Sequence, residues 1–411
     1  MTLSRRARLG AAALSAVAAT ALSVTITGGS TSTGSTGTTA ISRGGPAVPP
    51  VAVVPGATAA VLTPEMFGAA GDGEQDDTRA LQEALAALRS GDSLTLGEGR
   101  TYRHHDVLEL TTPRTTLTGP GVLLAADEER SSLFVRADGV EVRGVVLRIT
   151  GTTRRWTGLT QHRLVVQASA DVRVRDVRVE GSAGAGVYVE ASSRFRLERL
   201  VVVDTRADGI HMTGGSTDGV VVSPLVQRSG DDGVAVVSYD ADRGPSARIS
   251  VLSPRVEGTT WGRGVSVVGG EDVTYRDVHV QDSSAAGVYI ATEGEPFNTR
   301  PVARVQVLGA EVLRANHTST VDHGAVLIAS GSVERPVDDV VVERLRITGT
   351  RGGASRQVGV LGEEGSVKAV ALRSFVVEGG GDVFQSTAGH SAYRANGWIV
   401  DGTALADAGG A

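Results

Sequence analysis

The sequence has 411 residues, with 40 basic against 46 acidic side chains and no cysteine. The slightly acidic balance gives no basic surface for a nucleic acid or an anionic membrane. Without cysteine there are no disulfides, thiolate metal sites or cysteine nucleophiles. The 54 glycines and the 4% of aromatic residues are typical of short valine-rich strands joined by tight turns. We therefore expect an all-β chain.

Residues 1–27 have the pattern of an export signal peptide. Arg5, Arg6 and Arg8 precede an alanine-rich apolar stretch with small residues suited to cleavage. The pattern predicts a secreted, extracellular protein exported by the twin-arginine or the general secretory route. An uncleaved membrane anchor is less favoured, because the apolar run is short and contains several Ser and Thr residues.

Residues 28–62 are rich in Gly, Ser and Thr and then in Pro, which is the composition of a linker. The folded domain is therefore predicted for residues 63–405. It begins with one amphipathic helix over residues 78–88, for which Asp76 or Asp77 is the expected N-cap. We expect this helix to cover an exposed β edge, and we assign these aspartates turn and capping roles rather than a metal site.

A repeat follows, in which a glycine precedes alternating small apolar residues. Successive glycines of the repeat are 23, 24, 31, 23 and 37 residues apart. The glycines are Gly186, Gly209, Gly233, Gly264, Gly287 and Gly324. The shorter spacings fit one rung of three short strands, and the longer ones fit a rung with an inserted loop. The fold class predicted is a right-handed parallel β-helix, a single-chain solenoid with an N-terminal capping helix.

The two faces of this strand differ when the repeats are aligned on the glycine. The positions one and three after it are apolar and are predicted to face the core: Val187/Val189, Ile210/Met212, Val234/Val236, Val265/Val267, Val288/Ile290 and Ala325/Leu327. The position two after it faces outward and is mixed: Tyr188, His211, Ala235, Ser266, Tyr289 and Val326.

Ionisable residues gather just before the repeat glycines. The preceding position holds Ala185, Asp208, Asp232, Arg263, Ala286 and His323. Asp231 and Asp322 come one residue earlier. Stacked rungs place such residues at one edge of one sheet, about 4.8 Å apart. We therefore predict a site there, although ordinary solvated turn residues are the alternative.

The segment FGAAGDGEQDDTRALQEALAA resembles the N-terminal cap of the pectate-lyase-like right-handed β-helix superfamily, and with the repeats this likeness extends from residue 63 to about 385. ADGIH at 207–211, SGDDGVAV at 229–236 and GRG at 262–264 resemble the NTD, DD and GHG motifs of the polygalacturonase family (glycoside hydrolase family 28). The resemblance implies a polysaccharide hydrolase with Asp231 as general acid. Asp208 and Asp232 would together activate water for an inverting attack.

The sequence departs from the motifs of that family at several positions. Arg206 stands in place of the asparagine and Arg263 in place of the histidine. Tyr289 and Ala291 replace the two cations of the RIK motif that would bind a uronate carboxylate. The predicted substrate is therefore a neutral sugar, or a uronate held by Arg263.

The remaining substrate contacts are predicted from the outward positions and the flanking loops. His211, Tyr188, Tyr289 and His323 are expected to line the site, and Tyr239 and Trp261 flank it and are suited to stacking on a sugar. Packing under a loop is an equal alternative for the last two. Asp322 and His323 resemble an acid–imidazole pair, for which a plain surface turn is as well supported.

Two other classes remain open on this scaffold. A polysaccharide lyase or uronate epimerase would use an arginine, tyrosine or histidine as base and aspartates as calcium ligands. A non-catalytic glycan-binding β-helix would use the aspartates only as turn residues. In the hydrolase interpretation we expect a polysaccharide or oligosaccharide as partner and a monomer, with no cofactor, metal, nucleic acid or membrane. Calcium would be needed only in the lyase alternative.

Overall fold

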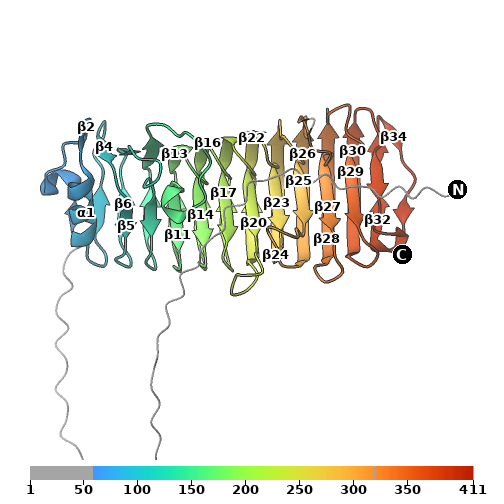
Figure 1. Ribbon diagram of the computed structural model, residues 1–411, viewed down its shortest axis with the longest axis horizontal. Helices are drawn as coiled ribbons and strands as arrows, with labels where there is room; N and C mark the ends of the chain where they lie inside the picture. The colour runs from blue at the N-terminus through green and yellow to red at the C-terminus, as the bar shows by residue number, and fades with distance from the viewer. Residues whose placement is uncertain (1–58, 319, 411) are drawn as a thin grey trace, which may run out of the picture. The chain divides into compact units, whose positions relative to one another are not determined.

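The structure is a computed structural model that describes residues 59–318 and 320–410. The predicted signal peptide and nearly all of the predicted linker lie outside the described residues. The domain from Ala59 onward is a right-handed parallel β-helix in which successive rungs stack in a row from the capping helix to the last strands (Figure 1). The predicted fold class is confirmed.

One sheet has 11 parallel strands and carries the repeat. Its strands are β5 (Leu108–Leu110), β8 (Leu133–Val135), β11 (Leu164–Gln167), β14 (Val187–Glu190), β17 (Ile210–Thr213), β20 (Val234–Val237), β23 (Val265–Val268), β25 (Val288–Ala291), β27 (Val326–Ser330), β29 (Val358–Gly362) and β31 (Phe384–Ser386). Each strand pairs with the next strand of this set along the chain, so every rung contributes one strand to the sheet.

The other sheet has 24 strands in two ladders that merge at β24. The first ladder contains β1 (Val61–Leu62), β3 (Ser93–Thr95), β6 (Thr116–Thr118), β9 (Glu141–Arg143), β12 (Arg173–Arg175), β15 (Arg196–Glu198), β18 (Val220–Val222) and β21 (Ala247–Leu252). The second contains β2 (Asp72–Asp76), β4 (Thr101–His104), β7 (Val122–Ala125), β10 (Val146–Ile149), β13 (Arg178–Ser182), β16 (Val201–Thr205), β19 (Leu225–Ser229) and β22 (Arg255–Thr259).

Long strands continue both ladders toward the C-terminus. They are β24 (Gly270–Gln281), β26 (Val302–Leu313), β28 (Val337–Thr348) and β30 (Val367–Glu378). The end is formed by β32 (Tyr393–Asn396), β33 (Ile399–Val400), β34 (Thr403–Ala404) and β35 (Ala408–Gly409), where β34 and β35 run antiparallel to β33 and β32. Paired strands thus begin two residues before the predicted start at Thr63 and extend past residue 405.

The helical segments are few. They are α1 (Thr78–Ala87) and three short 3-10 turns, η1 (Pro64–Phe67), η2 (Leu159–Gln161) and η3 (His390–Ala392). Helix α1 buries Leu81 and Leu85 over the first rungs, and this confirms the predicted cap. The carboxylate of Asp77 accepts from the N–H groups of Ala70 and Gly71 rather than capping the helix, whereas Asp76 accepts from Thr78 N. Among the described residues, no helix is long and apolar enough to cross a membrane.

The inward positions of the repeat form the core, as predicted for five of the six rungs. The Gly324 rung is a correction. Val326 pairs with Val288 and Leu327 pairs with Tyr289, so Val326 faces the core and Leu327 faces outward. The reason is that Ala325, not Gly324, accepts the backbone hydrogen bonds at the position of the repeat glycine. The predicted alignment of this rung is wrong by one residue.

Close stacking of the rungs explains the repeat glycine. In Gly186, Gly209, Gly233, Gly264 and Gly287, a Cβ atom would lie only 2.3–2.5 Å from a Cγ1 atom of a valine in the other sheet. None of these five glycines has a left-handed φ, so they are required by space rather than by backbone conformation. A glycine column of this kind fixes how each rung turns into the 11-stranded sheet.

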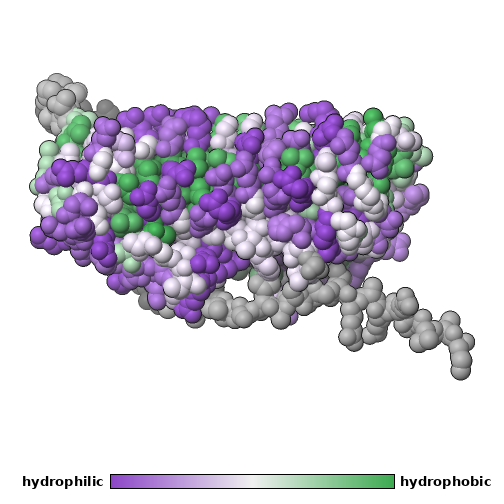
Figure 2. Space-filling model, turned by 90° about the horizontal axis from the view of Figure 1, so that it is seen from above, coloured by the Kyte–Doolittle hydropathy of each residue, from purple (hydrophilic) through white to green (hydrophobic). Residues whose placement is uncertain are grey.

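Arginine and aspartate side chains pair between successive rungs on the surface. The bidentate pairs are Asp171–Arg194, Asp176–Arg199, Asp204–Arg228, Asp218–Arg248, Asp272–Arg304 and Asp282–Arg314. They are exposed, so each contributes little to the stability of the fold. Figure 2 shows hydrophilic side chains spread along the length of the domain with hydrophobic patches between them.

Replacing a repeat glycine should destabilise the stack. Gly186→Ala would place its Cβ 2.3 Å from Val202 Cγ1 and 2.8 Å from Gly209 O, so we expect a loss of roughly 1–3 kcal/mol of unfolding free energy. Gly294→Ala is the matched control, because no atom lies within 4 Å of its added Cβ. Thermal unfolding of both variants checks this, and equal melting temperatures would contradict the packing explanation.

Candidate functional site

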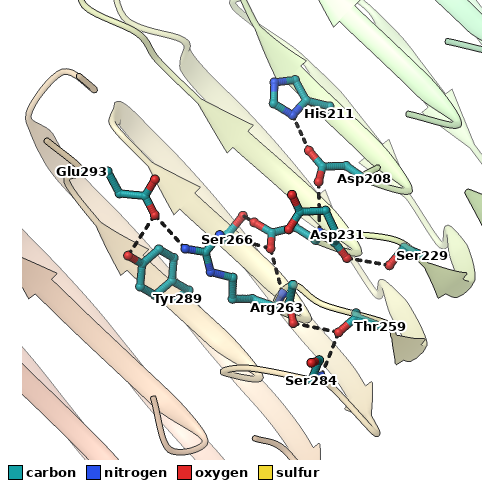
Figure 3. Close-up of polar contacts among 12 residues, drawn as sticks. Asp208, His211, Ser229, Asp231, Thr259, Arg263, Ser266, Ser284, Tyr289 and Glu293 are labelled. Carbon is teal, nitrogen blue, oxygen red and sulfur yellow. Dashed lines mark hydrogen bonds and ion pairs between the residues drawn. The ribbon is translucent and has the colours of Figure 1, made fainter. Parts of the chain in front are cut away.

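Three aspartates lie on two successive rungs, in the turns that lead into the 11-stranded sheet. Asp208 precedes β17, Asp231 and Asp232 precede β20, and Arg263 precedes β23 on the next rung. All three aspartates are less than 9% exposed. Figure 3 shows Asp208 and Asp231 close to each other at one edge of the sheet, and the N–H of Asp232 donates to Asp208. The sequence-predicted carboxylates are therefore brought together.

Asp232 is the most extensively hydrogen-bonded of the three. Its Oδ2 accepts from Ser266 Oγ at 2.5 Å, its Oδ1 accepts from Arg263 N at 2.7 Å, and its own N–H donates to Asp208 Oδ1 at 3.0 Å. Burial raises the pKa of Asp232, although Arg263 acts in the opposite direction. Asp232 thus connects the rung before it with the rung after it.

Asp208 is held in its ionised form. Its Oδ2 is hydrogen-bonded to His211 Nδ1. Burial acts to raise the pKa of Asp208, but the hydrogen bond from His211 and the positive charge of Arg155 outweigh it, so the pKa is lowered. The Nε2 atom of His211 is buried and has no hydrogen-bond partner among the described residues.

Asp231 is held in its protonated form below neutral pH. Burial, followed by the negative charges of Asp208 and Asp232, raises the pKa of Asp231 to about 7. Its Oδ2 accepts from Arg155 Nη1 at 2.7 Å, whereas its Oδ1 is buried with no partner in the part of the chain that the structure describes. An unpaired buried carboxylate oxygen favours the neutral acid.

Arg155 was not predicted from the sequence. It lies in the loop between β10 and η2, 76 residues before Asp231 in the chain. The segment TTRRWTG that contains it has no motif that would indicate this contact. Only the three-dimensional path of the loop brings the guanidinium to the carboxyl group.

Arg263 contacts several groups at the C-terminal side of the cluster. Its Nη2 donates to Glu293 Oε1 at 2.7 Å, and its Nη1 lies 3.5 Å from Asp232 Oδ1. Its Cζ atom is 4.1 Å from the centre of the Tyr289 ring, whose hydroxyl donates to Glu293. The ring of His323 stacks on that of Tyr289, with 5.5 Å between the two ring centres. Glu293 was not predicted.

A stack of rings extends along the N-terminal side. Tyr188 lies between His162 and His211, with ring centres 4.2 Å and 5.0 Å apart. His162 was not predicted; its Nδ1 accepts from Ala185 N, and burial lowers the pKa of His162 to about 3, so this ring is neutral. The outward column of the sheet therefore has aromatic and imidazole rings on both sides of the small residues Ala235 and Ser266.

The other predicted contacts differ in exposure. Tyr239 is partly buried against the outward apolar cluster that contains Ala235, which fits the packing alternative. Trp261 is 40% exposed and its ring faces Arg155. Asp322 accepts from Ser355 N and lies near Arg351 and Arg356. Among the described residues, no hydrogen bond joins Asp322 to His323, whose ring stacks on Tyr289 instead, and this fits the surface-turn alternative.

A groove of about 490 Å³ lies beside the cluster. It is lined by Thr152, Asp204, Thr205, Arg206, Arg228, Gly258, Thr259, Thr260, Asp282 and His317. The lining does not include the three aspartates. Within residues 59–318 and 320–410, no group of three or more His, Asp or Glu residues is arranged to hold a metal ion.

The fold and the cluster define a class: parallel β-helix proteins with buried carboxylates, arginines and imidazoles at the edge of one sheet. Residues 65–289, more than half of the chain, match the family described as "Rhamnogalacturonase A/epimerase, pectate lyase-like". The chain belongs to this family.

Individual relatives are more distant. The capsule KN3-specific depolymerase 1 of Klebsiella phage KN3-1 is 30% identical over 191 residues, which are 43% of this chain and 22% of the phage protein. The chain thus spans about a fifth of the length of that curated relative.

Three solved structures share the fold. The catalytic unit of an α-1,3-glucanase (GH87) from Streptomyces thermodiastaticus has 17% identity and a TM-score of 0.59, over 83% of this chain and 68% of that chain. The A-module of the mannuronan C-5 epimerase AlgE6 from Azotobacter vinelandii has 17% identity and a TM-score of 0.59, over 82% of this chain and 99% of that chain. The surface adhesin PfbA of Streptococcus pneumoniae has 14% identity and a TM-score of 0.61, over 83% of this chain and 90% of that chain. At these identities the likeness concerns the fold alone.

The raised pKa of Asp231 should appear in the pH dependence of stability. An unfolded aspartate titrates near 3.9, so between about pH 4 and 7 the folded protein binds more protons and loses stability as the pH rises. Asp231→Asn removes this titration. We expect the melting temperature of the variant relative to wild type to increase from pH 5 to pH 8.

Asp218→Asn serves as the control for this measurement. Its hydrogen bond to Arg248, followed by the one to Thr217, lowers the pKa of Asp218 to about 2, so residue 218 does not change its ionisation state between pH 5 and pH 8 in either protein. Its effect should be the same at pH 5 and pH 8. A difference for Asp231→Asn that does not change with pH would contradict the raised pKa.

Proposed function

We propose that this protein is a glycoside hydrolase that cleaves a polysaccharide by inversion, with Asp231 as general acid and Asp208 as general base. The family membership supports a role in polysaccharide chemistry, and the likeness of the three motifs to those of the polygalacturonase family supports the residue roles. The predicted export signal fits a substrate outside the cell, although that segment lies outside the described residues.

One observation carries the proposal: two neighbouring carboxyl groups whose pKa values are shifted in opposite directions. Asp208 has a lowered pKa and is ionised, so it can accept a proton from water. Asp231 has a pKa of about 7 and is protonated below neutral pH, so it can donate to the leaving oxygen. Glycosidic cleavage requires such an acid and base together.

Asp232 has a supporting role in this proposal. Its oxygens accept from Ser266 and Arg263, and its N–H fixes Asp208 Oδ1. Its negative charge contributes to the raised pKa of Asp231. We infer that Asp232 orients the base and helps to keep the acid protonated, rather than activating water jointly with Asp208 as the motif likeness implies.

The arginines favour a neutral sugar. Arg263 already contacts Glu293, Asp232 and the Tyr289 ring, and Arg155 donates to Asp231. A uronate carboxylate would have to displace one of these acidic partners. Ala235 and Ser266 lie between the ring stacks and are buried, whereas Tyr188 is partly exposed and can border a sugar.

Substitution of the proposed acid tests the function. Asp231→Asn should lower kcat for release of reducing ends by at least about 100-fold, with Asp218→Asn unaffected because that side chain pairs with Arg248 on the surface. The substrates to compare are α-1,3-glucan, rhamnogalacturonan, mannuronan and Klebsiella capsule. Wild-type activity should decline as the pH rises through about 7 and on the acid side only below the usual aspartate range.

Two results would contradict this proposal. Asp231→Asn with wild-type kcat would remove Asp231 from the reaction. Binding of these polysaccharides without any change in them would favour the non-catalytic alternative, in which the aspartates are turn residues.

A uronate epimerase or lyase is the second candidate, and the Asp208–His211 pair favours it. His211 has an unpaired Nε2 next to Tyr188, which is an arrangement that suits abstraction of a proton from a sugar carbon. Arg155 or Arg263 would then hold the uronate carboxylate after giving up an acidic partner.

His211→Gln separates the two candidates. In a hydrolase His211 acts through Asp208, so we expect reduced release of reducing ends that remains measurable. In an epimerase or lyase, His211→Gln should abolish the epimerase or lyase activity completely. Product analysis of wild type on mannuronan decides further: an ultraviolet-absorbing double bond indicates a lyase, and inversion at C5 without chain cleavage indicates an epimerase.

A further inference from the structure

We propose that Arg155 is a positioning residue for Asp231, and that its guanidinium stabilises the carboxylate that forms when Asp231 gives up its proton. The inference rests on the proposed function, because it assigns Asp231 the role of acid. Arg155 Nη1 donates to Asp231 Oδ2 at 2.7 Å, and the Asp231 side chain is only 10% exposed. The Arg155 side chain is 42% exposed, but it contacts a buried carboxyl group, whose ionised form a nearby cation favours.

The loop is anchored on both sides of Arg155. Before it, Thr152 accepts from the Arg206 guanidinium at 2.7–2.8 Å, and Thr153 N donates to Glu128 Oε2 at 2.6 Å. After it, Trp156 N donates to Ala183 O at 2.8 Å. These contacts fix the backbone, so Arg155 reaches Asp231 from a preorganised position. They also give Arg206 a function where the related motif has asparagine.

The charges around Asp231 explain why such a cation is needed. Asp208 lies on the rung before and Asp232 next to it in the chain, and both are acidic; Arg263 on the following rung is committed to Asp232 and Glu293. Proton donation by Asp231 adds a further negative charge to this group. Only Arg155 donates directly to an Asp231 carboxyl oxygen among the described residues.

The interaction between Arg155 and Asp231 therefore becomes stronger as the reaction proceeds. With neutral Asp231 the guanidinium makes one charge-assisted hydrogen bond, and as the proton leaves, the same contact becomes an ion pair. Contacts that strengthen in the transition state raise kcat rather than substrate affinity. Without Arg155, Asp231 would hold its proton more tightly and would be a weaker acid.

Infrared titration of the free protein tests this without a substrate. The carboxyl C=O stretching band of Asp231 is identified as the band lost in Asp231→Asn. In Arg155→Gln its midpoint should rise by about one pH unit, since a nearby opposite charge lowers a carboxyl pKa by roughly 1–3 units. Arg154→Gln is the matched control, because Arg154 stacks on Trp156 instead, and its midpoint should equal that of wild type.

Kinetics on a polysaccharide that the wild type cleaves provide the second readout. At pH 5, Arg155→Gln should lower kcat about tenfold with little change in KM, and the alkaline limb of the pH profile should move upward. Arg155→Lys should recover part of the loss. Arg155→Met replaces the Gln variant if that one is poorly folded, because its stem can still pack toward Trp261.

The outcomes separate the two proposals. An unchanged midpoint and unchanged kcat in Arg155→Gln, with Asp231→Asn inactive, would overturn the role of Arg155 and leave the hydrolase proposal standing. Full activity of Asp231→Asn would overturn the hydrolase proposal itself, whatever the infrared midpoints are.

Discussion

The close stacking of rungs determines both the fold and the site. At each turn into the 11-stranded sheet, a valine methyl and the backbone of the next rung occupy the space where a Cβ would be, so glycine is required there. The same contact fixes the register of the residues just before the glycine. Asp208, Asp232 and Arg263 therefore occupy equivalent places on three neighbouring rungs, and their interactions follow from the repeat rather than from a special loop.

Burial of like charges then gives these side chains different properties. Asp208 has a protonatable ring and a backbone N–H as partners, Asp232 has a hydroxyl and a backbone N–H, and Asp231 has one guanidinium and one unpaired oxygen. The carboxyl group with the fewest donors is the one with the highest cost of ionisation. The identical side chains of Asp208 and Asp231 thus have pKa values shifted in opposite directions, and this difference is what acid–base chemistry on a sugar requires.

The local pattern of the sequence was sufficient for the fold, the capping helix and the carboxylate cluster, because period-two alternation and the glycine column determine them directly. It was not sufficient for Arg155, His162 and Glu293, which reach the cluster from other rungs or inserted loops. It also misplaced Leu327, since a left-handed Gly324 sits one residue before the position that the other repeat glycines occupy. Loop paths and single-residue shifts depend on tertiary contacts that no short pattern records.

The proposed chemistry depends on opposite protonation states of Asp231 and Asp208 in the folded protein. Neutron diffraction from deuterated crystals at about pH 6, between the two shifted pKa values, observes this directly. We expect a deuteron on the carboxyl group of Asp231 and none on that of Asp208. A bare Asp231 carboxylate, or a deuteron on Asp208, would contradict it.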